Sequence, residues 1–214
     1  MFNRQNFDLT AYCERLSTPP SELLYQLERE TYLKTLAPQM MSGHLQGRIL
    51  SLISRLKRPQ QILEIGTFTG YATLCLAEGL SEGGKIITLE ANPEMAYFIQ
   101  KYKRLAALEE AIDARTGKAE DLIPGLSGPF DLVFLDAGKR DYAHHYDLLI
   151  DQVRSGGILL ADNVLWSGKV LQPEQDFDRD TQLLHAFNQK LRDDPRVENV
   201  LLPIRDGLMV LQKR

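Results

Sequence analysis

Five short apolar runs, rich in β-branched residues, recur along the chain. Their apolar character is continuous, without the alternation of apolar and polar positions that marks a strand with one face in solvent. We therefore expect strands that are buried on both faces of a sheet. The runs cover residues 61–65, 85–89, 130–135, 157–161 and 200–203, and a shorter candidate covers 111–116.

Helical patterns separate these runs, at residues 71–79, 93–108, 143–153 and 180–191. Alternating strands and helices predict a doubly wound α/β fold, with a mostly parallel sheet, right-handed crossovers and helices on both faces. The tail differs, because Arg205-Asp206-Gly207 lies between two apolar segments and Asp-Gly is a strong hairpin signal. We expect an antiparallel hairpin to close the sheet there.

The front of the chain, residues 9–56, has a helical pattern. Ser21-Glu22 follows Pro19-Pro20, which is typical of a helix start, and residues 45–56 carry apolar positions at helical spacing. Two roles stay open for this segment: a helical cover for the sheet, or a lid over a bound cofactor. We expect a single domain over residues 1–214, with an N-terminal helical cover (1–57) and a sheet core (58–214).

Length and charge narrow the classes of protein. The 214 residues suffice for one α/β domain, and the net charge of -4 weighs against a general nucleic-acid binder, although a local basic patch can coexist with it. Cys13 and Cys75 show no metal-ligand spacing, which fits a reducing compartment. Because we find neither a signal-peptide pattern nor an apolar stretch long enough to span a membrane, we expect a cytoplasmic protein.

The most informative motif follows the first run, where Glu64 precedes a turn that contains Gly66 and Gly70. Dinucleotide-binding turns have the spacing G-x-G-x-x-G, which lets the backbone approach a pyrophosphate. Here the spacing is E-x-G-x-x-x-G, and a carboxylate in the turn repels phosphate and attracts a cation. S-adenosylmethionine carries an ammonium and a sulfonium but no phosphate, so it fits this turn better than NAD. An ordinary strand–helix turn and an NAD-binding oxidoreductase stay as alternatives.

Polar residues follow the other runs at the point where each strand should end. Glu90 lies about twenty residues beyond the glycine turn, where an acid can accept both hydroxyls of a ribose. Asp136 follows the run 130–135, and Asp162-Asn163 follows 157–161. Three oxygen-bearing side chains at one edge of a sheet suit a hard divalent cation such as Mg²⁺. The alternative is that they cap helices and turns.

Three more residues are candidates for substrate chemistry. Lys139 lies three residues after Asp136, and a lysine that is partly buried beside a cation can act as a base. Tyr142 could form a wall of a substrate pocket, and Trp166 could stack on a planar substrate. The structural alternatives are a solvated lysine, a tyrosine on an amphipathic helix and a tryptophan in the core. The sequence contains no H-E-x-x-H, G-x-S-x-G or G-x-x-x-x-G-K-[ST] motif, which argues against hydrolases and P-loop proteins.

The set of motifs, in this order, resembles the cation-dependent O-methyltransferases that use S-adenosylmethionine, a family that includes catechol and caffeoyl-CoA O-methyltransferases and bacterial relatives. The resemblance runs from about Met40 to the C-terminus. It rests on the segment 64–71, Glu90, Gly117-Lys118-Ala119, the string 136–142, Asp162-Asn163 and the segment 203–208. It implies a seven-stranded, Rossmann-like methyltransferase sheet with an antiparallel last strand, and a homodimer.

The resemblance also implies roles for particular residues. The cofactor contacts would be Met41, Glu64, Gly66, Thr67, Tyr71, Ala72, Glu90, Ala119 and Asp136. The metal, Mg²⁺ or another divalent cation such as Mn²⁺ or Ca²⁺, would be held by Asp136, Asp162 and Asn163. Lys139 and Asp136 would be catalytic, with Lys139 beside the reacting oxygen. Two departures are Ala72, where a serine is common, and Gly138, where plant members commonly have an acid.

A metal that chelates the acceptor requires two neighbouring oxygens but does not name the molecule. A catechol-like phenolic small molecule meets that requirement, and so does 5-hydroxyuridine in tRNA, which some bacterial relatives methylate. Basic residues cluster at Arg48, Arg55, Lys57 and Arg58, but such clusters are usually a solvated helix face. The acidic total charge favours the small molecule. A binding module with a degenerate site is a further alternative, which the joint presence of Asp136, Lys139, Asp162 and Asn163 disfavours.

Overall fold

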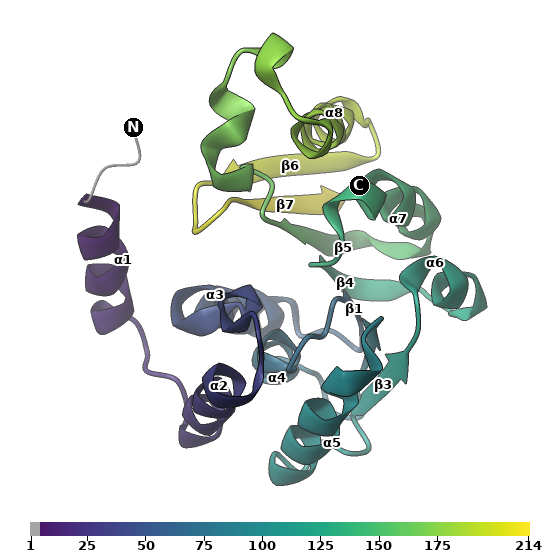
Figure 1. Ribbon diagram of the computed structural model, residues 1–214. Coiled ribbons are helices and arrows are strands. Elements are labelled where there is room, and N and C mark those ends of the chain that lie inside the picture. Colours follow the sequence, from purple (N-terminus) through teal and green to yellow (C-terminus); the bar gives the residue numbers. More distant parts are fainter. Residues whose placement is uncertain (1–4) are drawn as a thin grey trace.

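Seven strands form one sheet in the order β3-β2-β1-β4-β5-β7-β6 (Figure 1). This computed structural model describes residues 5–214. Strands β1 to β5 pair in parallel, whereas β7 is antiparallel to both of its neighbours. The strands are β1 (Gln61–Ile65), β2 (Lys85–Glu90), β3 (Ile112–Thr116), β4 (Phe130–Leu135), β5 (Val153–Asp162), β6 (Val197–Leu202) and β7 (Leu208–Lys213).

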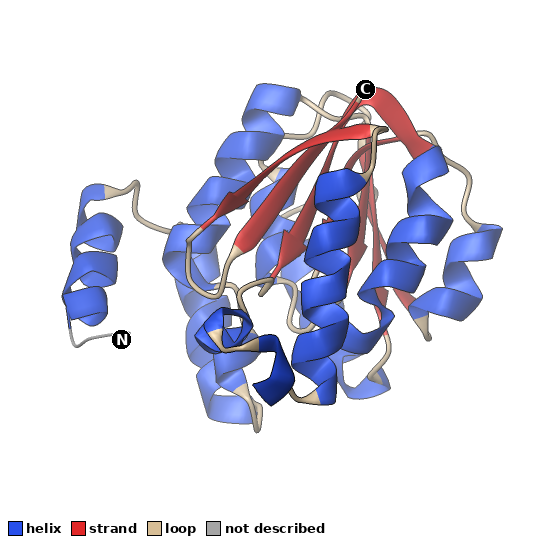
Figure 2. Cartoon of the chain, turned by 90° about the horizontal axis from the view of Figure 1, so that it is seen from above, coloured by secondary structure: helices blue, strands red, loops and turns tan. Residues whose placement is uncertain are grey.

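Helices cover both faces of this sheet (Figures 1 and 2). On one face, α4 (Tyr71–Ala77) and α5 (Ala96–Leu105) join a buried apolar cluster with alternate residues of the central strands. On the other face lie α6 (Ala119–Leu122), α7 (Tyr142–Leu149) and α8 (Arg179–Asp193). All six residues of β4 are buried, as expected for a central strand of a parallel sheet. The predicted doubly wound, mostly parallel sheet with an antiparallel C-terminal hairpin is confirmed.

The front of the chain is helical, as its pattern predicts. It forms α1 (Gln5–Leu16), α2 (Glu22–Lys34), a short 3₁₀ turn, η1 (Pro38–Met40), and α3 (Gly43–Lys57). The N-terminus of α2 is capped by Ser21, whose hydroxyl accepts a hydrogen bond from the Leu24 N–H at 3.3 Å. Helix α3 packs closely on α4, because Gly47 leaves room for the Tyr71 ring; a Cβ atom there would lie 2.7 Å from it.

Among residues 5–214, no helix has both the length and the apolar character that crossing a bilayer requires. Two 3₁₀ turns complete the elements near the cavity described below. They are η4 (Lys139–Asp141), directly before α7, and η6 (Trp166–Leu171), after β5.

Candidate functional site

A cavity of about 990 Å³ opens at the carboxyl end of the parallel strands. Residues that follow β1, β2, β4 and β5 line it, as do the segment 34–40 and the hairpin turn between β6 and β7. This is the edge at which open α/β sheets bind ligands. The predicted site residues that line the cavity are Gly66, Glu90, Ala119, Asp136, Lys139, Asp162, Asn163 and Trp166.

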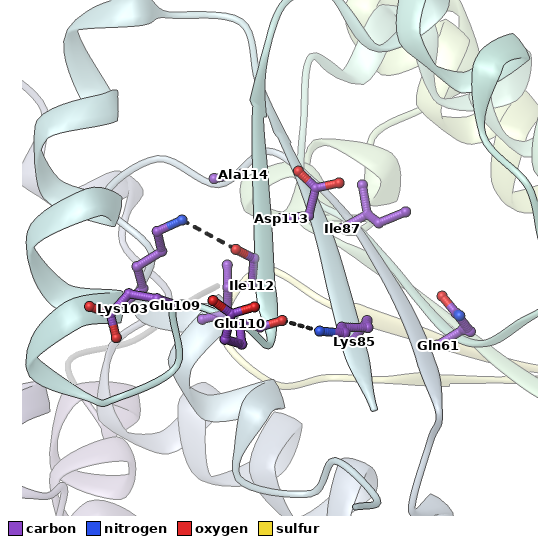
Figure 3. A pocket seen from close by; sticks show the side chains of 9 residues that line it. All are labelled: Gln61, Lys85, Ile87, Lys103, Glu109, Glu110, Ile112, Asp113 and Ala114. Carbon is purple, nitrogen blue, oxygen red and sulfur yellow. Dashed lines mark hydrogen bonds between the residues drawn. The ribbon is translucent and has the colours of Figure 1, made fainter. Parts of the chain in front are cut away.

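A second, smaller cavity of about 480 Å³ lies at the opposite end of the sheet (Figure 3). It is formed where β1, β2 and β3 begin, and none of the predicted site residues lines it. Its two lysines, Lys85 and Lys103, both donate to main-chain carbonyl oxygens, those of Glu110 and Ile112. These hydrogen bonds therefore fix the main chain at the start of the edge strand β3.

Gly66 brings the turn after β1 into direct contact with the end of β4. Its φ is +98°, and a Cβ atom at this position would lie 1.9 Å from the carbonyl oxygen of Asp136. The Asp136 N–H in turn donates to the Ile65 carbonyl at 2.8 Å. A glycine is required here both for the left-handed conformation and for the close approach. The glycine turn and Asp136 therefore lie side by side.

Glu64, which immediately precedes that turn, is fully buried. Its Oε2 accepts hydrogen bonds from the hydroxyls of Thr73 and Thr88, the latter at 2.6 Å, whereas its Oε1 has no partner in the described part of the chain. Burial raises the pKa of Glu64 to about 8. A buried carboxyl oxygen without a donor is costly, so a cationic donor next to it would be stabilised.

Glu90 lies at the wall of the cavity, where its carboxylate holds the glycine turn. Its Oε2 accepts the Phe68 N–H at 2.7 Å, and its Oε1 accepts the Asn92 N–H at 2.8 Å. A carboxylate has about four acceptor positions, so both oxygens retain capacity for hydroxyl donors. Glu90 can therefore accept further hydrogen bonds, and its role at a ribose stays a prediction.

Five of the predicted cofactor residues do not line the cavity within the described residues. They are Glu64 and four others, Met41, Thr67, Tyr71 and Ala72, which are also buried. Thr67 pairs through its hydroxyl with Thr88, and Tyr71 packs against α3. Met40, the neighbour of the predicted Met41, lines the cavity instead, together with Phe68.

Asp136 and Lys139 form a partly buried ion pair at the end of β4. The Lys139 Nζ lies 3.2 Å from Asp136 Oδ1 and donates to the Tyr142 hydroxyl at 2.7 Å. Burial raises the pKa of Asp136 to about 6; Lys139 opposes this rise, and the nearby Asp162 adds to it. Asp136 and Asp162 thus lie close together at the ends of adjacent strands, with Lys139 and Arg205 as the nearby cations.

Tyr142 and Trp166 differ in their access to the cavity. Tyr142 is fully buried behind Lys139, and its hydroxyl lies 3.1 Å from the carbonyl oxygens of both Leu135 and Asp162. Tyr142 does not line the cavity, so it would influence a substrate only by holding Lys139. Trp166 lines the cavity, and its indole N–H has no partner among residues 5–214.

The donor set proposed for a metal consists of two carboxylates and an amide. No group of three or more His, Cys, Asp and Glu residues that could hold a metal is found in residues 5–214. Asp136, Asp162 and Asn163 nevertheless line one cavity and offer hard oxygen ligands, few in number, as Mg²⁺ prefers. The residues fit the group, and the use of a divalent cation stays a prediction.

Two residues that hold this site in place do not stand out in the sequence. Gln46, in α3, donates from Nε2 to Asp162 Oδ2 at 2.7 Å, and Arg205 donates from Nη1 to Gln46 Oε1 at 3.2 Å. The family resemblance takes in the segment that contains Arg205 but gives that residue no role. Because Gln46 and Asp162 are 116 positions apart, no local pattern could have revealed their contact.

Comparison with known proteins agrees with this geometry. A family model described as O-methyltransferase matches residues 14–214. The catechol O-methyltransferase of Niastella koreensis is 37% identical over 161 residues, which cover 73% of this chain and 72% of the relative. Caffeoyl-CoA O-methyltransferase 1 of Arabidopsis thaliana is 31% identical over 223 residues, covering 98% of this chain and 85% of the relative.

Solved structures show the same fold over almost the whole chain. A Podospora anserina methyltransferase bound to SAH (S-adenosylhomocysteine) has a TM-score of 0.90 at 30% identity and covers 100% of this chain and 97% of its own. An O-methyltransferase from Bacillus cereus, also in complex with SAH, has a TM-score of 0.88 at 27% identity, with 97% of each chain covered. The oxidoreductase alternative does not agree with these relatives. The chain belongs to the O-methyltransferase family, and the enzyme class predicted from its motifs is confirmed.

Proposed function

We propose that this enzyme transfers a methyl group from S-adenosylmethionine to a hydroxyl of an acceptor that has two neighbouring oxygens, with a divalent cation at Asp136, Asp162 and Asn163. One observation carries the proposal. The glycine turn and Glu90, suited to the cofactor, line the same cavity as the three oxygen ligands and Lys139. Solved relatives bound to SAH support the choice of cofactor.

On the cofactor side, Gly66 and Ala119 would allow close approach of the ligand, and Glu90 would accept the ribose hydroxyls. The unpaired Oε1 of Glu64 would face the cofactor's ammonium, directly or through one water. Met41, Thr67, Tyr71 and Ala72 would shape this wall from behind, since they are buried next to it. Asp136 would border both the cofactor and the metal.

On the acceptor side, Asp136, Asp162 and Asn163 would hold the cation. When bound, Mg²⁺, or Mn²⁺ or Ca²⁺ in its place, supplies positive charge that orients the acceptor and favours its ionised form. The Lys139 Nζ would take the hydroxyl proton or stabilise the oxyanion, and Tyr142 holds that Nζ in place at 2.7 Å. The new oxygen–carbon bond forms as the carbon–sulfur bond breaks, and the electron pair of that bond returns to sulfur. Trp166 would stack on the acceptor ring.

The charges on α3 favour a phenolic small molecule over tRNA. Arg48 and Arg55 both pair with Glu78, at 2.7 and 2.9 Å, and Lys57 donates to the Gly156 carbonyl. Three of the four basic side chains of the cluster are therefore engaged within the chain, although the single carboxylate of Glu78 offsets only part of their charge. Relatives named for catechol and caffeoyl-CoA support the same choice. A homodimer and a cytoplasmic location stay predictions.

The acceptor is tested with methyl-labelled S-adenosylmethionine and two substrates, catechol and bulk tRNA. We expect label in catechol, little label in tRNA, and loss of transfer to catechol in Asp162→Ala. Asp113→Ala is the matched control, because Asp113 is an exposed acid at the far end of the sheet. Transfer to tRNA at a rate above that for catechol would contradict the proposed acceptor, and full activity of Asp162→Ala would contradict the proposed metal site.

A further inference from the structure

Gln46 is a buried polar side chain that joins three distant parts of the chain. It lies in the first turn of α3 and is 1% exposed. Its Nε2 donates to Asp162 Oδ2 at 2.7 Å, at the end of β5, and its Oε1 accepts from Arg205 Nη1 at 3.2 Å, in the hairpin turn. Both ends of the amide are therefore occupied by charged partners.

The chemistry of these partners fixes which way the amide points. A carboxylate only accepts hydrogen bonds and a guanidinium only donates them, so the amide nitrogen must face Asp162 and the amide oxygen must face Arg205. The other oxygen of Asp162, Oδ1, accepts the Asn163 N–H at 2.8 Å. With one donor on each oxygen, the Asp162 carboxylate is held in one orientation and still has free lone pairs.

Arg205 is itself held in an unusual conformation. Its φ of +49° lies in the left-handed region, which is costly for a residue other than glycine. The same Nη1 that reaches Gln46 donates to the carbonyl oxygens of Met41, at 3.1 Å, and of Ser42. Arg205 thus binds the hairpin turn to the segment that enters α3, and its contacts offset the backbone strain.

We propose that Gln46, held by Arg205, is the positioning residue that orients the Asp162 carboxylate for the divalent cation. The proposal rests on the proposed function, since it requires a metal at Asp162. Groups that hold a ligand side chain in place contribute on the order of 10- to 100-fold to metal affinity. Arg205 acts on Asp162 through Gln46, so its effect on metal binding depends on the glutamine.

Titration with Mn²⁺ alone, followed by electron paramagnetic resonance of the free ion, tests this in the full chain without any turnover. Gln46→Met keeps the length of the side chain and removes both hydrogen bonds. We expect it to weaken Mn²⁺ binding about 10-fold or more. Gln189→Met is the control, because Gln189 is exposed on α8 and hydrogen-bonds only His185 within the described residues; we expect its affinity to be unchanged.

A second variant separates positioning from a general loss of structure. Arg205→Lys leaves the buried amide in place and keeps a positive charge near Asp136, and we expect it to weaken Mn²⁺ binding less than Gln46→Met does. In the double variant, the loss should equal that of Gln46→Met alone, because the arginine acts through the glutamine. If the losses of Mn²⁺ affinity in the two single variants add up in the double variant, Arg205 does not act through Gln46. This conclusion holds even if thermal melting shows that the variants are less stable.

The outcomes also distinguish the two proposals. Wild-type protein that binds Mn²⁺, with Gln46→Met binding it equally well, would overturn the positioning role and leave the proposed function intact. Wild-type protein that binds no Mn²⁺ would overturn both. Weaker binding by Gln46→Met, with an unchanged affinity for S-adenosylhomocysteine, is the result that the geometry predicts, because Gln46 contacts Asp162 and does not line the cavity.

Discussion

At the scale of single residues, the site depends on groups that tolerate little change. Gly66 permits a main-chain contact that no side chain could fit, and Glu64 is a buried acid with one oxygen left unpaired in the described part of the chain. The spacing E-x-G-x-x-x-G predicts a role for both residues, because strand–turn–helix geometry is local. It does not predict that Gly66 meets Asp136, seventy positions away, since that contact depends on how β1 pairs with β4.

Gly66→Ala should destabilise the protein strongly. The added Cβ would lie 1.9 Å from the Asp136 carbonyl oxygen, so the backbone must shift in addition to bearing a left-handed alanine. Gly156→Ala is the matched control, because Gly156 also has a positive φ, +73°, but open space around it. We expect a cost of about 1–2 kcal/mol for Gly156→Ala and clearly more for Gly66→Ala in urea denaturation. Equal costs would show that the close approach to Asp136 is absent.

Glu64 should make the stability of the cofactor-free protein depend on pH. Its pKa is about 8 in the folded state and 4.5 as a free side chain, so the folded state binds the proton more tightly. The corresponding stability is fully present below about pH 4.5 and is lost as the pH rises through about 8. Between about pH 5 and 8.5, the melting temperature of the wild type should therefore fall by several degrees more than that of Glu64→Gln. Parallel pH profiles of the two proteins would rule this out.

At the scale of elements, the apolar runs predicted six of the strands and the Asp-Gly hairpin signal predicted β7, while only β1 and β4 agree with the predicted bounds throughout. Strand β5 differs, since it begins at Val153 and not at 157. The polar segment Arg154-Ser155-Gly156 has the composition of a turn, and Gly156 is in the left-handed conformation. The segment nevertheless continues the strand, with a shift in the register of its pairing with β4. Helix α7 ends at Leu149, and a 3₁₀ turn, η5 (Ile150–Gln152), continues it almost to the predicted 153. Pairing with β4 decided where β5 begins, and a local pattern does not contain that pairing.

Helix α2 and the segment that follows it are relevant to the choice between cover and lid. Residues 34–40 line the cavity, and α2 is fixed to α5 through Glu30, which accepts hydrogen bonds from Lys101 at 2.5 Å and from the Tyr102 hydroxyl at 2.7 Å. Burial alone would raise the pKa of Glu30, but hydrogen bonds from Lys101, Lys34 and Tyr102 outweigh it and hold the pKa at about 2. Thr31 adds a 3.0 Å hydrogen bond to Thr69 in the glycine turn.

Glu30→Gln should therefore weaken cofactor binding, although Glu30 does not line the cavity. The neutral amide loses the charge that attracts Lys101, so α2 and the segment 34–40 should be held less firmly against the cavity. We expect a several-fold weaker affinity for S-adenosylhomocysteine by calorimetry. Glu22→Gln, at the exposed start of the same helix, should bind as the wild type does. If both variants bind equally well, the segment is a passive cover of the sheet.

At the scale of the whole molecule, the fold brings together residues that the sequence keeps far apart. Positions of chemistry at strand ends were predictable, because parallel strands place their carboxyl ends at one edge. The residues that support these positions were not predictable. Gln46 contacts Asp162 over 116 positions, Arg205 contacts Gln46 over 159, and Glu30 contacts Lys101 over 71. Their residue types are ordinary for helices and turns, so nothing in the local pattern distinguishes them.

We have proposed that this cavity places a methyl donor beside a metal that holds two neighbouring oxygens. The most direct measurement is methyl transfer to catechol, compared with phenol, before and after removal of metal by EDTA. We expect methyl ether from catechol alone, loss of turnover with EDTA, and recovery when Mg²⁺ is added in excess of the chelator. Undiminished transfer to catechol in EDTA, or equal transfer to phenol, would contradict it.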